Sequence, residues 1–335
     1  MQRLILKLAL FAAMLALPWG VVEWQLERIP NSYSWKRQLL ERKGDVAKVL
    51  VLGSSHEYLG ISPSAFDCEG LNLANTSQAL FYDGEIVRRH LPQLGSLRLV
   101  LQGISYFSLE FMLSDSAEKW RGFYYRHFLG TRTDPGMSLL DLENFSLVAM
   151  YGRDQVLEFA AKRFDVSLTE HVDEYGWYDS RGNETLQPPK EDSGKAAATY
   201  HTSTMKPEHL PENVEVIARM RERLRQRGVT LVLITLPVFR TYTAQLDPVR
   251  RERWYAEIAQ LQARFGLTYR DYAEDSRFAV DDFFDADHLN ARGAVKFSRI
   301  LNEEIIRPLG ACAAPLGEHR VAHAADHARP SRPQR

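Results

Sequence analysis

The sequence predicts an α/β fold in which helices cover both faces of a parallel β-sheet. Two observations support this prediction. Short runs of apolar, often β-branched residues recur along the chain, and segments with the spacing of amphipathic helices separate them. Consecutive parallel strands need a crossover connection, usually a helix, so this alternation predicts a three-layer α/β/α sandwich. Hydrophobic residues make up 45% of the chain and charged residues 25%. Both values are typical of soluble globular proteins and exclude disordered, collagen-like and multi-span membrane proteins.

Five segments are predicted to be strands. Most of them are short apolar runs that end near a glycine or a polar turn, as expected for strands buried on both faces. The run VTLVLITL is the strongest of them. The predicted strands span residues 46–52, 70–74, 97–101, 229–236 and 267–271.

Helices are predicted between and after these strands. The segment 214–227 places Val216, Met220 and Leu224 on one stripe and ends at Gly228. Gly266 closes another helix in the same way, and Pro308 stops the last one. The predicted helices cover residues 79–94, 214–227, 254–265 and 291–306.

Two regions lie outside this alternation. Residues from about 107 to 205 separate the third and fourth strands by more than one crossover needs, which predicts an insertion. Within it, residues 139–164 are expected to be helical and residues 173–200 to form a polar loop. Residues 311–335 lack periodicity and are expected to be a disordered tail. Its histidines, expected to be solvated rather than to bind metal, are His319, His323 and His327.

The N-terminus has the pattern of a membrane segment. Arg3 and Lys7 precede the uncharged apolar run 8–22, and Trp19 and Trp24 suit a membrane interface. The run is short for a spanning helix but lacks a small-residue cleavage site, so an uncleaved anchor is favoured over a cleaved signal peptide. Residues 1–44 are therefore predicted to be a membrane anchor and linker, and residues 45–310 the globular domain.

Charge and cysteine content exclude several classes of protein. The formal net charge is -1, and no basic stripe indicates a nucleic-acid partner. Cys68 and Cys312 are the only two cysteines, which excludes a disulfide scaffold and a multi-cysteine zinc site. They can form at most one disulfide, and the sequence does not show whether they do.

The residues suited to chemistry follow the predicted strands or precede the last helix. Ligands of open parallel sheets bind beyond the carboxyl ends of the strands. Gly53-Ser54-Ser55-His56 follows the first strand, and 72–78 (NLANTSQ) follows the second. Asp285-Ala286-Asp287-His288 precedes the last helix. A serine nucleophile needs a base such as histidine, and the base needs an orienting acid.

This order of motifs resembles the SGNH (GDSL-like) hydrolase superfamily. Its first block matches Gly53-Ser54-Ser55, and its last block, Asp-x-x-His, matches 285–288. Three segments look closer to a subgroup, the membrane-anchored SGNH-like proteins of bacterial envelopes, which are similar to DltD and AlgJ/AlgX. The segments are LGSSHEYLGISPSAF, GLNLANTSQALFYDGEIVRRHL and FDADHLNARGAVKFS. The resemblance covers residues 45–108 and 228–306 and implies a flavodoxin-like sandwich.

The resemblance also implies roles for individual residues. Ser55 would be the nucleophile, His288 the base and Asp285 its orienting acid, with Asp287 the alternative orienter. Ser77 stands where the family has an oxyanion-hole glycine, and the third block has no asparagine. The candidates for the oxyanion hole are therefore Ser77, Ser105 and Asn75.

Other side chains are candidates for a substrate groove. His56 is expected at the rim of the site. Aromatic rings stack on sugar faces, so several aromatic residues are considered for the groove, with ordinary packing as the alternative for each. They are Tyr106, Trp177, Tyr178, His201 and Tyr242, of which Tyr106 and Trp177 are retained with His56 as groove candidates.

The resemblance implies acyl-ester chemistry on an envelope polysaccharide through an acyl-enzyme at Ser55. Water as acceptor would make the protein an esterase, and a sugar hydroxyl would make it an O-acyltransferase. The domain is expected on the periplasmic side of a bacterial inner membrane, with a membrane-bound O-acyltransferase as a partner and no metal or organic cofactor. The alternatives are a non-catalytic polysaccharide-binding or scaffold protein and a cytoplasmic lipid-type esterase.

Overall fold

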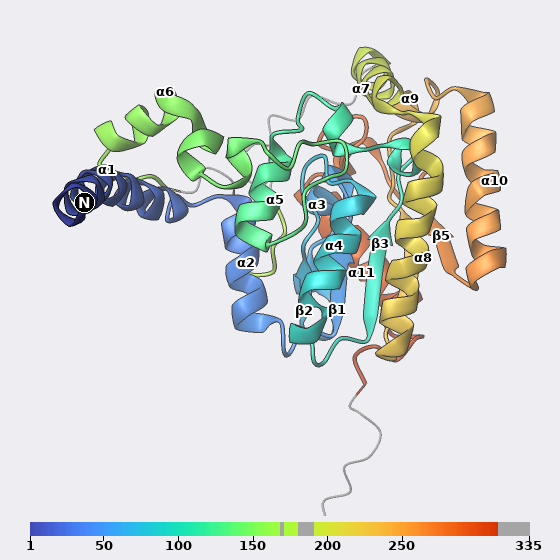
Figure 1. The fold of residues 1–335 in the computed structure, drawn as a ribbon. Helices are drawn as coiled ribbons and strands as arrows, with labels where there is room; N and C mark the ends of the chain where they lie inside the picture. Colours follow the sequence, from blue (N-terminus) through green and yellow to red (C-terminus); the bar gives the residue numbers. More distant parts are fainter. Residues whose placement is uncertain (168–170, 180–190, 314–335) are drawn as a thin grey trace, which may run out of the picture.

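The architecture of the chain, taken from a computed structural model, is a parallel β-sheet between two layers of helices (Figure 1). The structure describes residues 1–167, 171–179 and 191–313. The predicted disordered tail therefore lies outside the described residues from residue 314 onward, as does part of the predicted polar loop.

Five strands form the sheet in the order β2-β1-β3-β4-β5, and every neighbouring pair is parallel. This is the flavodoxin-like order, and it confirms the predicted parallel α/β sandwich. The registers place Val49 beside Gly70 and Leu99, and Leu99 in turn beside Thr230. The strands are β1 (Val49–Leu52), β2 (Gly70–Asn72), β3 (Leu99–Gly103), β4 (Thr230–Thr235) and β5 (Thr268–Asp271).

Side chains of successive strand residues enter two different cores. Leu50 and Leu52 of β1 belong to the larger core, whereas Val49 and Val51 point to the opposite face and pack in a smaller one. This alternation follows from the two-residue period of a strand. Because both faces of β1, β3 and β4 are covered, these strands are mainly apolar runs, which explains why the sequence predicted them. The edge strand β5 is largely exposed.

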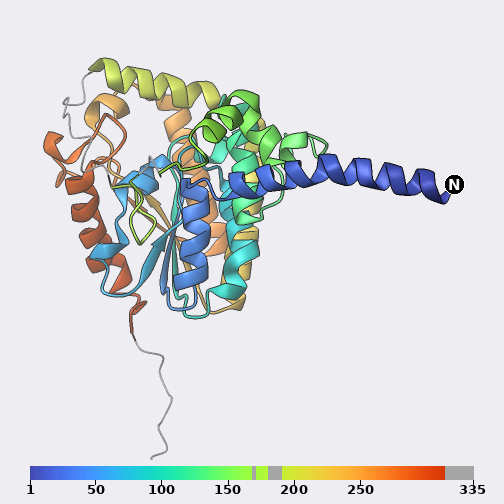
Figure 2. The same cartoon turned by 90° about the vertical axis from the view of Figure 1, so that its left-hand side faces the viewer.

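Four helices on one face of the sheet pack in the larger core, and α11 on the other face packs in the smaller core (Figure 2). In Figure 2, α11 lies on one side of the sheet and α2 and α4 on the other. The helices that pack in the larger core are α2 (Ser32–Lys43), α4 (Leu80–His90), α8 (Leu210–Gln226) and α10 (Pro248–Phe265). The last helix, α11 (Ala291–Leu301), continues as a π-helical turn over Asn302–Ile306.

Helix α2 was not predicted, because the sequence analysis assigned its residues to a linker. Asn31 caps it: the Asn31 side chain accepts the N–H of Ser34, and the Ser34 side chain accepts the N–H of Asn31. Leu39 and Leu40 then join the larger core. Leu26 and Ile29, which precede α2, also belong to this core, although they lie within the predicted anchor and linker.

In the described part of the insertion at about 107–205, three α-helices form: α5 (Arg121–Leu129), α6 (Leu147–Ala161) and α7 (Glu191–Thr204). Helix α6 lies within the predicted helical segment. Helix α7 occupies residues that were expected to be a polar loop, and it lies beside the short helix α9 (Arg240–Thr243) (Figure 1). Its small residues allow this approach: a Cβ atom at Gly194 would lie 2.2 Å from the carbonyl oxygen of Thr241.

The N-terminal helix α1 (Gln2–Glu27) extends away from the body (Figure 2). Its last turns are attached: Leu26 is buried, and the Glu23 carboxylate accepts the N–H of Leu147 at the start of α6 at 2.7 Å. The predicted membrane anchor is not supported, since within the described part of the chain no helix has both the length and the apolar character that crossing a membrane requires.

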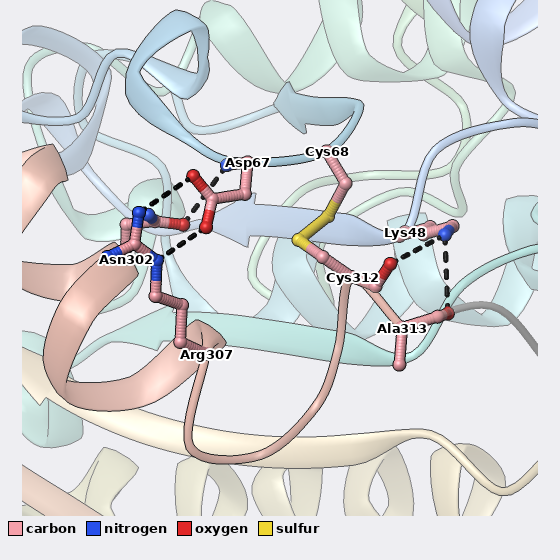
Figure 3. Close-up of a disulfide and its surroundings, with 7 residues drawn as sticks. All are labelled: Lys48, Asp67, Cys68, Asn302, Arg307, Cys312 and Ala313. Carbon is pink, nitrogen blue, oxygen red and sulfur yellow. Dashed lines mark hydrogen bonds and ion pairs between the residues drawn. A yellow bond between two sulfur atoms is a disulfide. The ribbon is translucent and has the colours of Figure 1, made fainter.

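A disulfide between Cys68 and Cys312 joins the end of the described chain to the segment before β2 (Figure 3). Polar contacts surround it. Arg307 Nη2 lies 3.1 Å from Asp67 Oδ1, and Lys48 Nζ donates to the carbonyl oxygen of Cys312 at 3.0 Å. The sequence left open whether Cys68 and Cys312 are joined, and the structure shows that they are. The disulfide also fixes residues just beyond 310, where the tail was expected to begin.

Candidate active site

The turn after β1 positions Ser55 at the first residue of helix α3 (Ser55–Gly60). Gly53 has a φ of 139°, a conformation that favours glycine. Ser54 is the N-cap: its side chain accepts the N–H of His56 at 3.4 Å, and its own N–H donates to Glu57 Oε2 at 2.7 Å. This capping box fixes the backbone on both sides of Ser55, which leaves its hydroxyl at the carboxyl end of β1.

Glu57 supports the turn from beneath and is fully buried. Burial raises the pKa of its carboxyl to about 8. Two glycines make room for this side chain. A Cβ atom at Gly103 would lie 1.9 Å from Glu57 Cδ, and one at Gly53 would lie 2.3 Å from Glu57 Oε2. The close approach of β1, β3 and α3 therefore depends on residues without a side chain.

Replacing Gly103 with alanine is expected to destabilise the protein and to disturb Ser55. The new methyl group would overlap the Glu57 carboxyl and displace the capping box, and overpacking of this kind costs roughly 1–3 kcal/mol. Chemical denaturation measures the loss. Gly95→Ala is the control, because the nearest heavy atom to its Cβ would be 3.9 Å away. Equal stability of the two variants would contradict the proposed packing.

The second half of the site is the loop before α11. Asn290 caps α11 by accepting the N–H of Gly293 at 3.0 Å, as an asparagine before a helix is expected to do. The Asp285 carboxylate folds the loop back on itself by accepting the N–H groups of Asp287 and His288 at 3.0 and 2.8 Å. The backbone thus places the Asp285 carboxylate and the His288 ring next to one another.

Ser55, His288 and Asp285 form a continuous hydrogen-bonded chain. His288 Nε2 lies 2.8 Å from Ser55 Oγ, and His288 Nδ1 lies 3.0 Å from both carboxylate oxygens of Asp285. These are the contacts expected of a serine nucleophile, its base and the acid that orients the base. Asp287, the alternative orienter, has its Oδ2 atom 3.6 Å from the same Nδ1 atom, so Asp285 is the hydrogen-bond partner.

Two carboxylates control the protonation of His288. Burial alone would lower the pKa of its imidazole, but the negative charges of Asp287 and Asp285 outweigh burial and raise the pKa to about 9. Asp287 responds in the opposite direction. Burial opposes its charge, but the neighbouring imidazoles of His288, His56 and His201 lower its pKa.

Because a general base must be unprotonated, activity that depends on His288 is expected to rise with pH. Below pH 9 the rate should increase about tenfold per pH unit and then level off. Asp287→Asn removes one of the two stabilising charges and should move the midpoint to lower pH. The measurement is the pH profile of serine acylation for both proteins in a chelating buffer. An unchanged midpoint in the variant would contradict the role assigned to Asp287.

A cleft of about 480 Å³ opens in front of Ser55 and His288. This volume lies in the range of small-molecule sites. Its walls are mainly apolar and come from the start of α3, the loop after β2, the insertion and the loop before α11. The wall residues include Leu59, Phe107, Phe111, Ala196, Tyr200 and Phe284, with Glu118 and His201 among the polar ones.

Of the three oxyanion candidates, only Ser77 lines this cleft. Its φ of 54° lies in the left-handed region, which glycine adopts most readily. This conformation agrees with the glycine that SGNH-like hydrolases have at the position that Ser77 matches. The other two have their donors engaged elsewhere. The Ser105 N–H donates to Ser108 Oγ at 2.9 Å, and the Asn75 N–H donates to the carbonyl oxygen of Gly53 at 3.2 Å.

None of the three residues retained for the substrate groove lines the cleft. His56 is 2% exposed, so it lies behind the reacting groups and not at the rim. Tyr106 borders a separate small cavity next to Tyr242. Trp177 is buried beside α11, where its indole N–H donates to the carbonyl oxygen of Leu59 at 2.6 Å.

Sequence reasoning did not single out Phe107, Phe111 or Glu118, which do line the cleft. The Glu118 carboxylate accepts the Ser77 hydroxyl and pairs with Arg121 Nε at 2.9 Å. Phe111 and Glu118 belong to the part of the insertion that has no counterpart in the resemblance, and Phe107 lies at its edge. The resemblance therefore gave no signal for them.

Comparisons with known proteins identify no family for the chain. No protein-family model and no curated protein sequence matches it. Among solved structures, it is similar to the crystal structure of a "putative acylhydrolase" from Bacteroides fragilis, with a TM-score of 0.37 and 12% sequence identity, over 80% of this chain and 96% of that one. A likeness of this size does not assign a function, so the resemblance to SGNH-like envelope proteins stays a prediction from sequence motifs.

Proposed function

We propose that this protein is a serine-dependent acyl hydrolase or acyltransferase of the SGNH type. The observation that supports the proposal is the contact of 2.8 Å between Ser55 Oγ and His288 Nε2, with Asp285 on the other ring nitrogen. A non-catalytic scaffold would not need these side chains to converge. Their convergence at the mouth of an apolar cleft favours catalysis.

The first half of the proposed reaction makes an acyl-enzyme. Ser55 Oγ attacks the carbonyl carbon of an ester while His288 Nε2 takes the hydroxyl proton. Asp285 holds the ring and stabilises the imidazolium that forms. The oxyanion would be held by backbone N–H groups of Ser55, which opens α3 and has no partner inside that helix, and of Ser77. His288 then gives its proton to the leaving alcohol as the carbon–oxygen bond breaks.

The second half transfers the acyl group to an acceptor hydroxyl. His288 removes the proton of that hydroxyl, the new ester or acid forms, and Ser55 regains its proton. Water as acceptor completes hydrolysis, and a sugar hydroxyl completes transfer. The resemblance supplies the rest of this proposal: an envelope polysaccharide as substrate or acceptor, and a membrane-bound O-acyltransferase that delivers the acyl group.

The disulfide supports a location outside the cytoplasm. Structural disulfides form and persist in oxidising compartments and are rare in the cytosol. We place the globular domain in such a compartment because Cys68 and Cys312 are joined. Trapping thiols with a maleimide in intact cells tests this: the two cysteines should be protected until a reductant is added.

Trapping the acyl-enzyme tests the proposed chemistry. Wild-type protein incubated with p-nitrophenyl acetate should release p-nitrophenol in a burst and gain one acetyl group, which peptide mass spectrometry should locate on Ser55. Addition of a soluble oligosaccharide distinguishes transfer from hydrolysis by the appearance of an acetylated sugar. Ser64→Ala, at an exposed serine, is the matched control for Ser55→Ala. Acetylation that is equal in Ser55→Ala and wild type would refute the proposal.

A further inference from the structure

Three more polar side chains meet next to the triad, beside the Nδ1 edge of the His288 ring. Asp287 Oδ2 lies 3.4 Å from His56 Nε2, 3.6 Å from His288 Nδ1 and 3.8 Å from His201 Nε2. His56 and Asp287 are 2% and 6% exposed. The mechanism proposed above uses only His288 from this group. We refer to His56, Asp287, His288 and His201 as the rear cluster.

One polar atom of the rear cluster, His56 Nε2, faces inward without a hydrogen bond among the described residues. His56 Nδ1 is engaged by the Ser105 hydroxyl at 2.9 Å, which turns Nε2 toward Asp287. Among the described residues, this buried Nε2 atom has no hydrogen-bond partner. Leaving a buried polar group unpaired costs stability, so an unpaired nitrogen that faces a carboxylate indicates a site for a cation.

The spacing matches that of ligands around one metal ion. Two atoms that each lie ~2.0–2.1 Å from a tetrahedral zinc ion are roughly 3.3–3.4 Å apart. The separations of 3.4 and 3.6 Å between Asp287 Oδ2 and the two imidazole nitrogens are close to this value. The ligand atoms of His56, Asp287 and His288 all lie within 4.8 Å of one another. Imidazole and carboxylate together are a ligand set that zinc prefers.

Partners of the ligands strengthen this match. A metal-bound histidine usually has its other ring nitrogen held by a hydrogen bond, which fixes the orientation of the ring. Ser105 does this for His56, and the Tyr242 hydroxyl does it for His201, at 2.8 Å from His201 Nδ1. His201 stands next to the three ligands, with its Nε2 atom turned toward the same carboxylate oxygen.

We propose that His56 Nε2, Asp287 Oδ2 and His288 Nδ1 bind a zinc ion that switches the triad off. Zinc on Nδ1 needs that nitrogen unprotonated, so the remaining ring proton of His288 sits on Nε2 and faces Ser55 Oγ. In this state Nε2 cannot accept the serine proton, and the hydrogen bond from Nδ1 to Asp285 is lost. The inhibition rests on the proposed function, whereas zinc binding does not.

Zinc binding is measured on the full chain, with the tail histidines removed as competing ligands by His319→Ala, His323→Ala and His327→Ala together. Calorimetry against a competing chelator should show one tightly bound zinc per chain, and cobalt should give the absorption of a tetrahedral site. Loss of a residue that only hydrogen-bonds a metal ligand typically lowers metal affinity ~10–100-fold. His56→Gln and Asp287→Asn each remove a ligand itself, so each should weaken zinc binding by at least this factor. His209→Gln is the control, because His209 also pairs with one carboxylate, that of Asp115, but belongs to no group of three metal-ligating side chains within the described chain.

Two results would overturn the inference. One is the absence of zinc binding in the chain without tail histidines, and the other is binding that His56→Gln and Asp287→Asn leave unchanged. Activity is a separate readout: zinc should slow acylation of Ser55, and a chelator should restore it. If the protein binds zinc as described but has no acylation to inhibit, the proposed function fails while the metal site stands.

Discussion

Replacing Ser55 with alanine is expected to lower the rate of ester cleavage about 10⁴-fold or more. The alanine has no hydroxyl to form the acyl-enzyme, and no other described serine contacts His288 Nε2. His288→Ala should cost about as much, because the hydroxyl of Ser55 is a weak nucleophile without its base. The measurement is the steady-state hydrolysis of p-nitrophenyl acetate in a chelating buffer.

Combining the substitutions tests whether these residues act as a unit. The double variant Ser55→Ala/His288→Ala should be no slower than either single variant, because the first substitution already removes the pathway. Asp285→Asn should have a smaller effect than the other two. The Asp287 carboxylate is still 3.6 Å from His288 Nδ1 and stabilises the imidazolium in part. Effects of the serine and histidine substitutions that multiply in the double variant would contradict a shared mechanism.

Removal of the disulfide is expected to give the largest loss of stability outside the core. Cys68 and Cys312 are 244 positions apart in the sequence, so the crosslink restricts most of the unfolded chain. Disulfides that close long loops typically contribute about 2–5 kcal/mol to the free energy of unfolding. Cys68→Ser/Cys312→Ser should therefore unfold at clearly lower denaturant concentration than the oxidised wild type.

A reductant provides the control for this prediction. Dithiothreitol should lower the unfolding midpoint of the wild type toward that of the double variant and leave the variant unchanged. The polar contacts around the disulfide, such as that of Arg307 with Asp67, are partly exposed and are expected to contribute little alone. A double variant as stable as the oxidised wild type would contradict the assigned role of the crosslink.

The three inner strands could be predicted because they are buried on both faces. Each is then a short, mainly apolar run that stands out from its charged surroundings. Helices α2 and α7 left weaker signals. Two thirds of the residues of α2 are polar or charged, and the helix even buries Lys36, whose ammonium group lies over the Tyr58 ring. Helix α7 packs with Gly194 and Ala198, which carry little apolar surface.

The triad could be predicted because its members lie in short motifs whose order follows the order of the strands. The Asp-x-x-His spacing places Asp285 against His288 within one loop, and the parallel sheet brings that loop to Ser55. The cleft and the rear cluster could not be predicted in this way. His201 reaches Asp287 from the insertion, and a contact between segments so far apart leaves no periodic pattern in the sequence.

Labelling with a fluorophosphonate tests the central claim most directly, because this reagent reacts only with a serine that a base activates. The full chain, folded and free of metal, should form a single adduct on Ser55. Ser55→Ala and His288→Ala should both abolish the adduct, and Ser64→Ala should leave it unchanged. A folded wild-type protein that forms no adduct, or one whose adduct persists in Ser55→Ala, would contradict the assignment of Ser55 as an activated nucleophile.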